Sequence, residues 1–341
     1  MSAQLAGFRV GQRAETGNSY KIKQHLPWGA AVTRILHARL YRHTTVKAGP
    51  RCATFGSLSR VYAETMSFRL TWTRRLLPFA IAAALAAQPQ VPAAKKHLLI
   101  IGEEKGYRHE AVSHAMATIE HLGRETGLWD TVIRTDTEIL TKKKLEYNAK
   151  NLNDFDAVLF YTGGTLEMDE QQKADFISFI HEDGKGFIGI HSAAITFTNW
   201  PAYGEMIGGY YDEHPWAVFD APILVEDAAF PGIGKWPKAF TLSDEIYQMK
   251  NYSRDNTRVL MRLDPSKLDL ANPKVHRKDN DFAVTWAKMY GKGRVFYSTL
   301  GHVEANWDRP EMQAMMIEAI KWATHLVDAD VTPRPFPGKQ K

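Results

Sequence analysis

Histidine and carboxylate residues are the side chains of this sequence best suited to proton transfer. His191 and Ser192 directly follow Gly186–Ile190, a short and mostly apolar run. A second histidine, His302, comes late in the chain, with Glu304 two residues after it. Because imidazole has an unperturbed pKa of about 6.5, it can take up or release a proton near neutral pH. We therefore predict His191 and His302 as acid/base residues.

Further side chains are predicted to complete a pocket around this pair. Glu245 and Tyr247 lie around one bend, and we predict Glu245 as an additional catalytic carboxylate. Segment 199–216 is dense in aromatic residues, glycines and acids, a composition suited to holding a sugar ring; packing in the core is the alternative. Glycines at a strand end allow close backbone approach to a ligand. The predicted substrate-binding residues are His109, Gly163, Gly164, Ser192, Tyr203, His214 and Tyr247.

The histidines also raise the question of a metal ion. If His109, His191, His214 and His302 converged, their imidazoles could bind zinc. However, they are scattered along the chain and show no short ligand spacing such as His-x-x-x-His. We therefore predict no metal and no other cofactor, with a divalent metal such as zinc as the alternative.

The segments around these residues predict an α/β fold. Apolar runs alternate with helical patterns, which indicates a three-layer, doubly wound and mostly parallel sheet with helices on both faces. In such sheets, ligands bind at the carboxyl ends of the strands. Asp169 is predicted to cap one helix, Pro310 to begin the last helix, and Lys142–Lys144 to lie on a solvated helix face. The predicted strands are 97–101, 131–134, 156–161, 186–190, 222–225 and 258–263, followed by an antiparallel pair at 283–286 and 294–298.

Charge is unevenly distributed along the chain. Residues 1–65 contain ten Lys/Arg and two Asp/Glu, and residues 66–94 add three Arg. This leaves 30 of the 43 basic and 36 of the 38 acidic residues for 95–341, a net charge of −6. The basic character therefore belongs to the N-terminal part, and we predict no nucleic-acid partner.

Residues 66–87 have the pattern of a secretory signal peptide. Arginines precede a run of about a dozen apolar residues that ends in small residues near Ala86. Such a run is too short to cross about 30 Å of hydrocarbon as a helix, so we predict no stable membrane insertion. The mature protein is expected to be periplasmic or secreted. Residues 1–65 are then expected to be an over-extended gene start, with a disordered arm as the alternative, and residues 329–341 a tail.

Several motifs of the chain resemble the trehalose-utilisation (ThuA-like) family. They span about 97–326, and the predicted domain is 95–328. The matching pieces are Gly106-Tyr107-Arg108-His109, Gly189-Ile190-His191-Ser192-Ala193, Gly208-Gly209, His214-Pro215, Asp244-Glu245-Ile246-Tyr247, Tyr290-Gly291-Lys292-Gly293-Arg294-Val295-Phe296-Tyr297 and Gly301-His302.

The resemblance implies a flavodoxin-like fold related to class I glutamine amidotransferases. Those enzymes place a catalytic cysteine on a tight strand-to-helix turn, and His191 is found at the matching position. His302-Val303-Glu304 is similar to their His-Pro-Glu motif, which implies that Glu304 orients His302. The only cysteine, Cys52, lies in the N-terminal part, so no thiolate is available in the mature chain and glutaminase activity is excluded.

The family resemblance also implies a role in the metabolism of trehalose, other disaccharides or keto-sugars. A small-molecule carbohydrate is the expected partner, and a homo-oligomer is left open. The first hypothesis is an exported isomerase, lyase or hydrolase that uses acid/base chemistry in a histidine-lined pocket. The alternative is a non-catalytic sugar-binding or scaffolding module with the same fold.

Overall fold

The computed structural model describes residues 94–147 and 150–337. The predicted N-terminal extension and signal peptide lie outside the described residues, as does the end of the predicted tail. Within those two ranges, no helix combines the length and the apolar character needed to cross a membrane.

Within the described residues, nine strands form one mixed sheet in the order β2-β1-β3-β4-β11-β10-β9-β6-β7. The first five of these pair in parallel, and the pairings from β11 to β7 are antiparallel. A separate pair joins β5 (Tyr210–Glu213) to β8 (Gln248–Lys250). The sheet strands are β1 (Lys96–Ile101), β2 (Trp129–Arg134), β3 (Ala157–Phe160), β4 (Gly186–Ile190), β6 (Val218–Val225), β7 (Ala239–Glu245), β9 (Arg258–Leu263), β10 (Ala283–Tyr290) and β11 (Gly293–Ser298).

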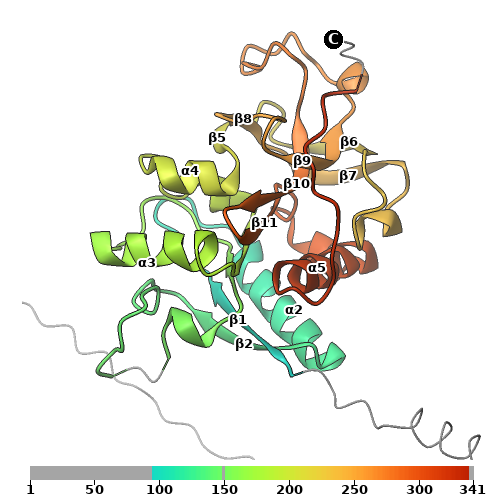
Figure 1. The fold of residues 1–341 in the computed structure, drawn as a ribbon. Coiled ribbons are helices and arrows are strands. Elements are labelled where there is room, and N and C mark those ends of the chain that lie inside the picture. The colour runs from blue at the N-terminus through green and yellow to red at the C-terminus, as the bar shows by residue number, and fades with distance from the viewer. Residues whose placement is uncertain (1–93, 148–149, 338–341) are drawn as a thin grey trace, which may run out of the picture. The chain divides into compact units, whose positions relative to one another are not determined.

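Helices cover both faces of the parallel part, as Figure 1 shows. The core residues of α2 (Ala111–Thr126) and α5 (Pro310–Ala323) belong to one hydrophobic cluster. Those of α3 (Glu170–His181) and α4 (Pro201–Ile207) belong to a second. Along β1, Leu98 and Ile100 join the first cluster while Leu99 and Ile101 join the second, because successive side chains of a strand point to opposite faces. The predicted three-layer α/β fold with an antiparallel extension is confirmed.

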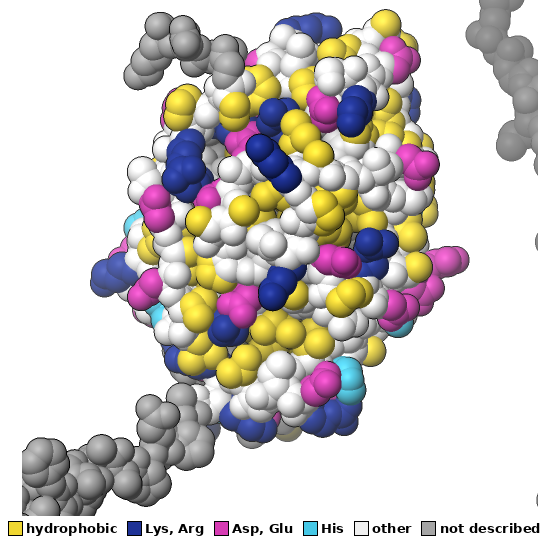
Figure 2. Space-filling view, turned by 90° about the vertical axis from the view of Figure 1, so that its right-hand side faces the viewer, with side chains coloured by type: hydrophobic (Ala, Val, Ile, Leu, Met, Phe, Trp, Pro, Cys, Tyr) yellow, Lys and Arg dark blue, Asp and Glu magenta, His cyan; other side chains and the backbone are white. Residues whose placement is uncertain are grey.

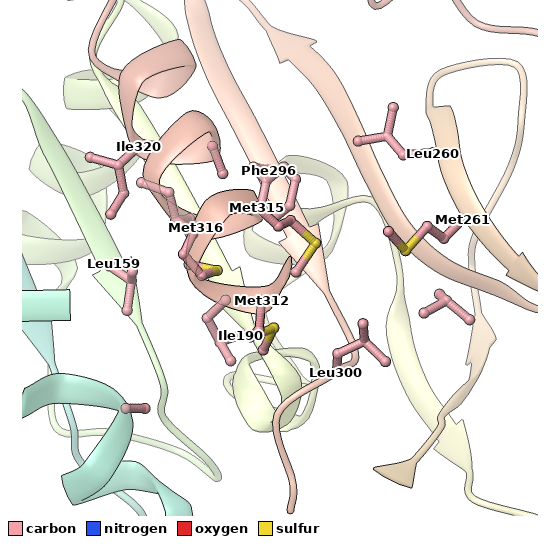
Figure 3. Packing of buried hydrophobic residues seen from close by; sticks show 14 of the residues in the cluster. Leu159, Ile190, Leu260, Met261, Phe296, Leu300, Met312, Met315, Met316 and Ile320 are labelled. Carbon is pink, nitrogen blue, oxygen red and sulfur yellow. The ribbon is translucent and has the colours of Figure 1, made fainter. Parts of the chain in front are cut away.

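The predicted packing of the last helix is also confirmed. Met312, Met315 and Met316 of α5 are buried and lie against the sheet, near Ile190 of β4 and Phe296 of β11 in Figure 3. Flexible thioether side chains fill irregular gaps in a core. Complete burial of one such side chain stabilises the fold by about 1.5–3 kcal/mol.

One predicted helix cap is confirmed and one predicted helix is wrong. The Asp169 carboxylate accepts a hydrogen bond from the backbone N–H of Gln172 and begins α3 with a capping box. Lys142–Lys144, in contrast, lie in an irregular segment. The backbone N–H of Lys142 donates to the buried carboxylate of Asp175, which replaces the bond that a helix would form.

Basic and acidic side chains are interspersed on the face seen in Figure 2, with apolar side chains between them. No large single-sign patch is visible on this face.

Candidate functional site

The predicted residues His191 and His302 meet because their strands are neighbours. His191 is the first residue after β4 and begins the 3₁₀ helix His191–Ile195, while His302 follows β11, which pairs with β4 in parallel. The backbone of His191 has φ 44°, a left-handed value that costs a residue with a side chain about 1–3 kcal/mol. The chain therefore makes a tight strand-to-helix turn at His191, as the resemblance implies.

Three histidines and one glutamate form a compact cluster at this edge, which we call the His/Glu cluster: His109, His191, Glu245 and His302. One potential ligand atom from each lies within 4.8 Å of the others. His191 Nε2 is 3.1 Å from His302 Nδ1 and 3.4 Å from Glu245 Oε2. His302 Nδ1 is 3.3 Å from the same carboxylate oxygen. Three imidazoles and a carboxylate could either transfer protons or ligate a metal ion.

Hydrogen bonds fix the orientation of the His191 ring. Its Nδ1 lies 2.7 Å from the backbone oxygen of Thr299. Because a carbonyl oxygen can only accept, Nδ1 carries the hydrogen, and Nε2 therefore faces the cluster. The Tyr297 hydroxyl donates to the backbone oxygen of His191 and holds the turn from behind. The Tyr247 hydroxyl lies 2.8 Å from Nε2.

Glu104 holds His109 in place, and sequence reasoning missed it. Its carboxylate accepts from the His109 backbone N–H at 2.7 Å and lies 2.5 Å from the His109 Nδ1. It also accepts from the hydroxyl of Ser192 at 3.2 Å. Ser192 is completely buried, so it supports Glu104 instead of lining the cavity. The available signal was position, because Glu104 follows β1 at the same edge as His191.

Asp244 is a second supporting carboxylate whose individual role was not predicted. It is completely buried and accepts hydrogen bonds from three backbone N–H groups. These belong to Glu245 at 3.0 Å, Gly301 at 2.8 Å and Val303 at 3.0 Å. Asp244 thereby ties the end of β7, which carries Glu245, to the loop that carries His302.

The electrostatics of the cluster separate its ionisable groups. Burial acts to raise the pKa of Glu245, but its contacts with the imidazoles of His191 and His302 outweigh burial and hold this pKa well below its usual range. The hydrogen bond to Glu245 raises the pKa of His302. Burial lowers the pKa of His191 and raises that of Tyr247. A charged Glu245 therefore lies among a neutral phenol, a neutral buried imidazole and an imidazole that holds its proton more tightly.

A cavity of about 460 Å³ opens above this cluster. Its volume falls within the usual range for small-molecule sites. The predicted pocket residues His109, His214 and Tyr247 line it, together with Glu245 and His302. The remaining lining residues are Tyr107, Ile195, Tyr211, Ala217 and Val218.

The structure does not place Glu304 where it was predicted to act. Glu304 begins the 3₁₀ helix Glu304–Asp308, its side chain is 56% exposed, and its carboxylate lies 3.9 Å from Nδ1 of His114. The backbone of Val303 is held by Asp244, and the chain then turns outward. Glu245 is therefore the carboxylate that contacts His302, and the orienting role assigned to Glu304 is wrong.

Three other predicted binding residues lie away from the cavity lining. Tyr203 is completely buried, and its hydroxyl donates to the backbone oxygen of Ala193. Gly163 and Gly164 pack against the loop that contains Glu104. Gly164 has φ 80°, and a Cβ at this position would lie 2.2 Å from the backbone oxygen of Lys105. These glycines shape the loop that holds His109, and the close approach they permit is to protein backbone.

Comparisons with known proteins agree with this architecture. Residues 97–323 match the family model of ThuA, described as trehalose utilisation. A ThuA-like protein from Bacteroides uniformis has a TM-score of 0.54 and 20% identity, over 69% of this chain and 94% of that one. A ThuA-like protein from Parabacteroides merdae has a TM-score of 0.52 and 15% identity, over 71% and 93%. No curated protein matches the sequence.

At these identities the two structures establish a shared fold. The family model adds more, because its match begins inside β1 and ends at the last residue of α5. It therefore includes every residue of the His/Glu cluster. The chain belongs to the ThuA family of trehalose utilisation.

Proposed function

We propose that this protein is an exported carbohydrate-active enzyme that moves protons on a disaccharide or its keto derivative. The observation that carries the proposal is the meeting of a charged Glu245, His302 and Tyr247 at the wall of a 460 Å³ cavity. Tyrosine rings at the cavity, Tyr107 and Tyr211, offer apolar faces to a sugar ring. The family description, trehalose utilisation, supports a sugar as the substrate.

His214 is well placed to act as the base. It lines the cavity, and its Nδ1 is buried without a hydrogen-bond partner among the described residues. This nitrogen lies 3.6 Å from Glu245 Oε1, so the carboxylate holds the imidazole ring at the cavity wall. Notably, Glu245 Oε2 faces His191 and His302, so its two oxygens serve different imidazoles.

A keto-sugar suits this arrangement because the hydrogen beside its carbonyl is acidic. His214 would remove that proton, and the electron pair of the broken C–H bond would form an enolate. The positive charge near His302 would stabilise the enolate oxygen. The protonated His214 would then pass its proton to an oxygen that leaves from the adjacent carbon, which returns His214 to its starting state. The result is elimination; return of the proton to the other side of the enolate would instead give isomerisation.

Hydrolysis by two carboxylates receives less support. That mechanism requires a pair of Asp/Glu residues on either side of the scissile bond. Among the described residues, Glu245 is the only carboxylate that lines the cavity.

The test is a product screen by NMR with trehalose, sucrose and their keto derivatives. We expect conversion of a keto-disaccharide by the wild type and a large loss of kcat in His214→Gln. The matched control is His121→Gln, because His121 is an exposed histidine on α2, with its side chain 63% accessible. Equal turnover by His214→Gln and the wild type would refute the assigned base. Calorimetric binding of the sugar without any product would favour the non-catalytic binding module.

A further inference from the structure

The His/Glu cluster crowds several polar atoms around one nitrogen of His191. With its Nδ1 hydrogen directed at Thr299, a neutral His191 offers a single lone pair at Nε2. Yet three polar atoms lie within 3.4 Å of Nε2: the Tyr247 hydroxyl, His302 Nδ1 and Glu245 Oε2. The ionised carboxylate can only accept, so it has nothing to exchange with that lone pair. A cation placed between His191 Nε2 and Glu245 Oε2 would be shared by these two facing acceptors.

The distances fit the coordination shell of a small ion. His191 Nε2, His302 Nδ1 and Glu245 Oε2 form a nearly equilateral triangle with sides of 3.1, 3.3 and 3.4 Å. Zinc bonds of about 2.0–2.1 Å in a tetrahedron separate neighbouring ligand atoms by about 3.3–3.4 Å.

The three imidazole rings are also arranged around a point. The ring centroids of His109, His191 and His302 are 4.9, 5.1 and 5.2 Å apart, and their planes meet at 70–88°. Steeply inclined rings cannot stack, but they can direct one nitrogen each toward a shared centre. The His109 nitrogen is the fourth candidate ligand atom, and all four lie within 4.8 Å of one another.

The groups behind the rings match those found at metal sites. A metal-ligating histidine usually donates its other N–H to a carboxylate or a backbone carbonyl, which fixes its tautomer and orientation. Here His109 Nδ1 contacts the Glu104 carboxylate and His191 Nδ1 contacts the Thr299 carbonyl. In both rings, Nε2 is therefore the nitrogen that remains for the cluster. Their burial further limits them to one orientation each, since His109 is 8% exposed and His191 0%.

We propose that His109, His191, His302 and Glu245 bind one divalent transition-metal ion. A donor set of three imidazoles and one carboxylate suits zinc, iron, nickel or copper better than magnesium or calcium, and zinc is the first probe. Three of the four ligands, His109, His302 and Glu245, line the cavity, so the ion would be accessible to a bound molecule. This site takes up the alternative of a divalent metal, with Glu245 in place of His214 among the four candidate ligands.

The role of the ion rests on the proposed function, although binding of the ion does not. On a keto-sugar, it would act as a Lewis acid toward the carbonyl oxygen and stabilise the enolate that forms when His214 takes the proton. His302 would then serve as a ligand, with the ion supplying the positive charge near the enolate.

The decisive measurement is metal binding without any sugar. Full-length protein is stripped with a chelator, then titrated with zinc against a chromophoric competitor and with cobalt by absorption. We expect the protein to bind one equivalent of metal. The visible absorption of bound cobalt should indicate a low coordination number. Glu104→Gln, which alters a support but no ligand, should weaken zinc binding by about 10–100-fold. His302→Gln and Glu245→Gln, which each remove a ligand, should weaken it further.

His276→Gln is the matched control. His276 is exposed and pairs with Asp212, outside the cluster. Zinc binding by His302→Gln and Glu245→Gln as tight as in the wild type, with circular dichroism showing all variants folded, would overturn the proposal. So would a wild type that binds no zinc, cobalt, nickel, iron or copper.

The two proposals can fail separately. His214→Gln leaves all four ligands intact, so it should keep zinc binding while losing turnover. Binding of one equivalent of zinc without conversion of any keto-sugar would support the metal site and refute the proposed enzymatic function. Full turnover by stripped protein that binds no metal would support the enzymatic function and refute the metal site.

Discussion

Replacement of Asp244 by asparagine should strongly destabilise the fold. Asp244 is buried, and its two oxygens accept three backbone N–H bonds: Oδ1 from Glu245 and Val303, and Oδ2 from Gly301. An asparagine keeps one acceptor oxygen and turns an NH₂ group toward the other side. In its better orientation, it therefore leaves the Gly301 N–H facing a donor.

The magnitude follows from three contributions. An unsatisfied buried donor costs about 1–3 kcal/mol. The two remaining bonds change from charge-assisted to neutral, a loss of about 1 kcal/mol each. Against these, burial of the Asp244 charge, which raises the pKa of this carboxyl, no longer opposes folding. The free energy of unfolding should fall by about 2–4 kcal/mol in Asp244→Asn.

Urea denaturation followed by tryptophan fluorescence measures this difference, provided that the m-value is unchanged. Asp220→Asn is the matched control, because Asp220 is an exposed carboxylate on the adjacent strand β6. An exposed substitution of this kind should change the free energy of unfolding by less than about 0.5 kcal/mol. If Asp244→Asn were no more destabilising than Asp220→Asn, the bonds to Gly301 and Val303 would not hold the loop as argued.

Three further predictions concern the rest of the fold. Met312→Ala should lower the free energy of unfolding by about 2–5 kcal/mol in urea, because it leaves a cavity beneath α5; a loss below 1 kcal/mol would show that the core collapses around it. Gly208→Ala should lower the melting temperature, since φ is 99° and the new Cβ would lie 2.8 Å from Nε1 of Trp286; an unchanged temperature would contradict this. Burial lowers the pKa of Lys288 to about 8, so the folded state releases this proton before the unfolded state does. The wild type should therefore gain stability relative to Lys288→Met as pH rises from 7 toward 10, by about 3 kcal/mol in total. A difference in free energy of unfolding that stays constant with pH, measured in urea, would refute this.

The sequence predicts the parallel part of the fold because its physical signals are local. Strands such as β1 are buried on both faces, so every residue of Leu98–Ile101 is apolar and the strand can be recognised from the sequence. The meeting of His191 and His302 also follows from general rules, since both come after strands whose carboxyl ends lie at one edge. The helix predicted at 142–144 is wrong because the charge pattern does not reveal that the backbone N–H of Lys142 donates to the Asp175 carboxylate.

Glu304 and Glu245 show where such reasoning stops. Spacing places Glu304 two residues from His302, but it does not give the direction in which the chain turns after β11. That direction is set by Asp244, which lies 57 residues from Gly301 in sequence. Likewise, Glu104 contacts Ser192 across 88 residues. Contacts of this kind join residues far apart in the chain, so the spacing of residues in the sequence does not reveal them.

The position of β11 has a consequence for synthesis of the protein. This strand is the last of the sheet to leave the ribosome, yet it lies between β4 and β10. Strands β1 to β4 can pair earlier, but the β4 edge then stays open until about 100 further residues have been made. An open, apolar strand edge invites pairing with other chains. The nascent chain therefore passes through a stage that requires protection, and a truncation before Gly293 would leave two half-sheets with no strand to join them.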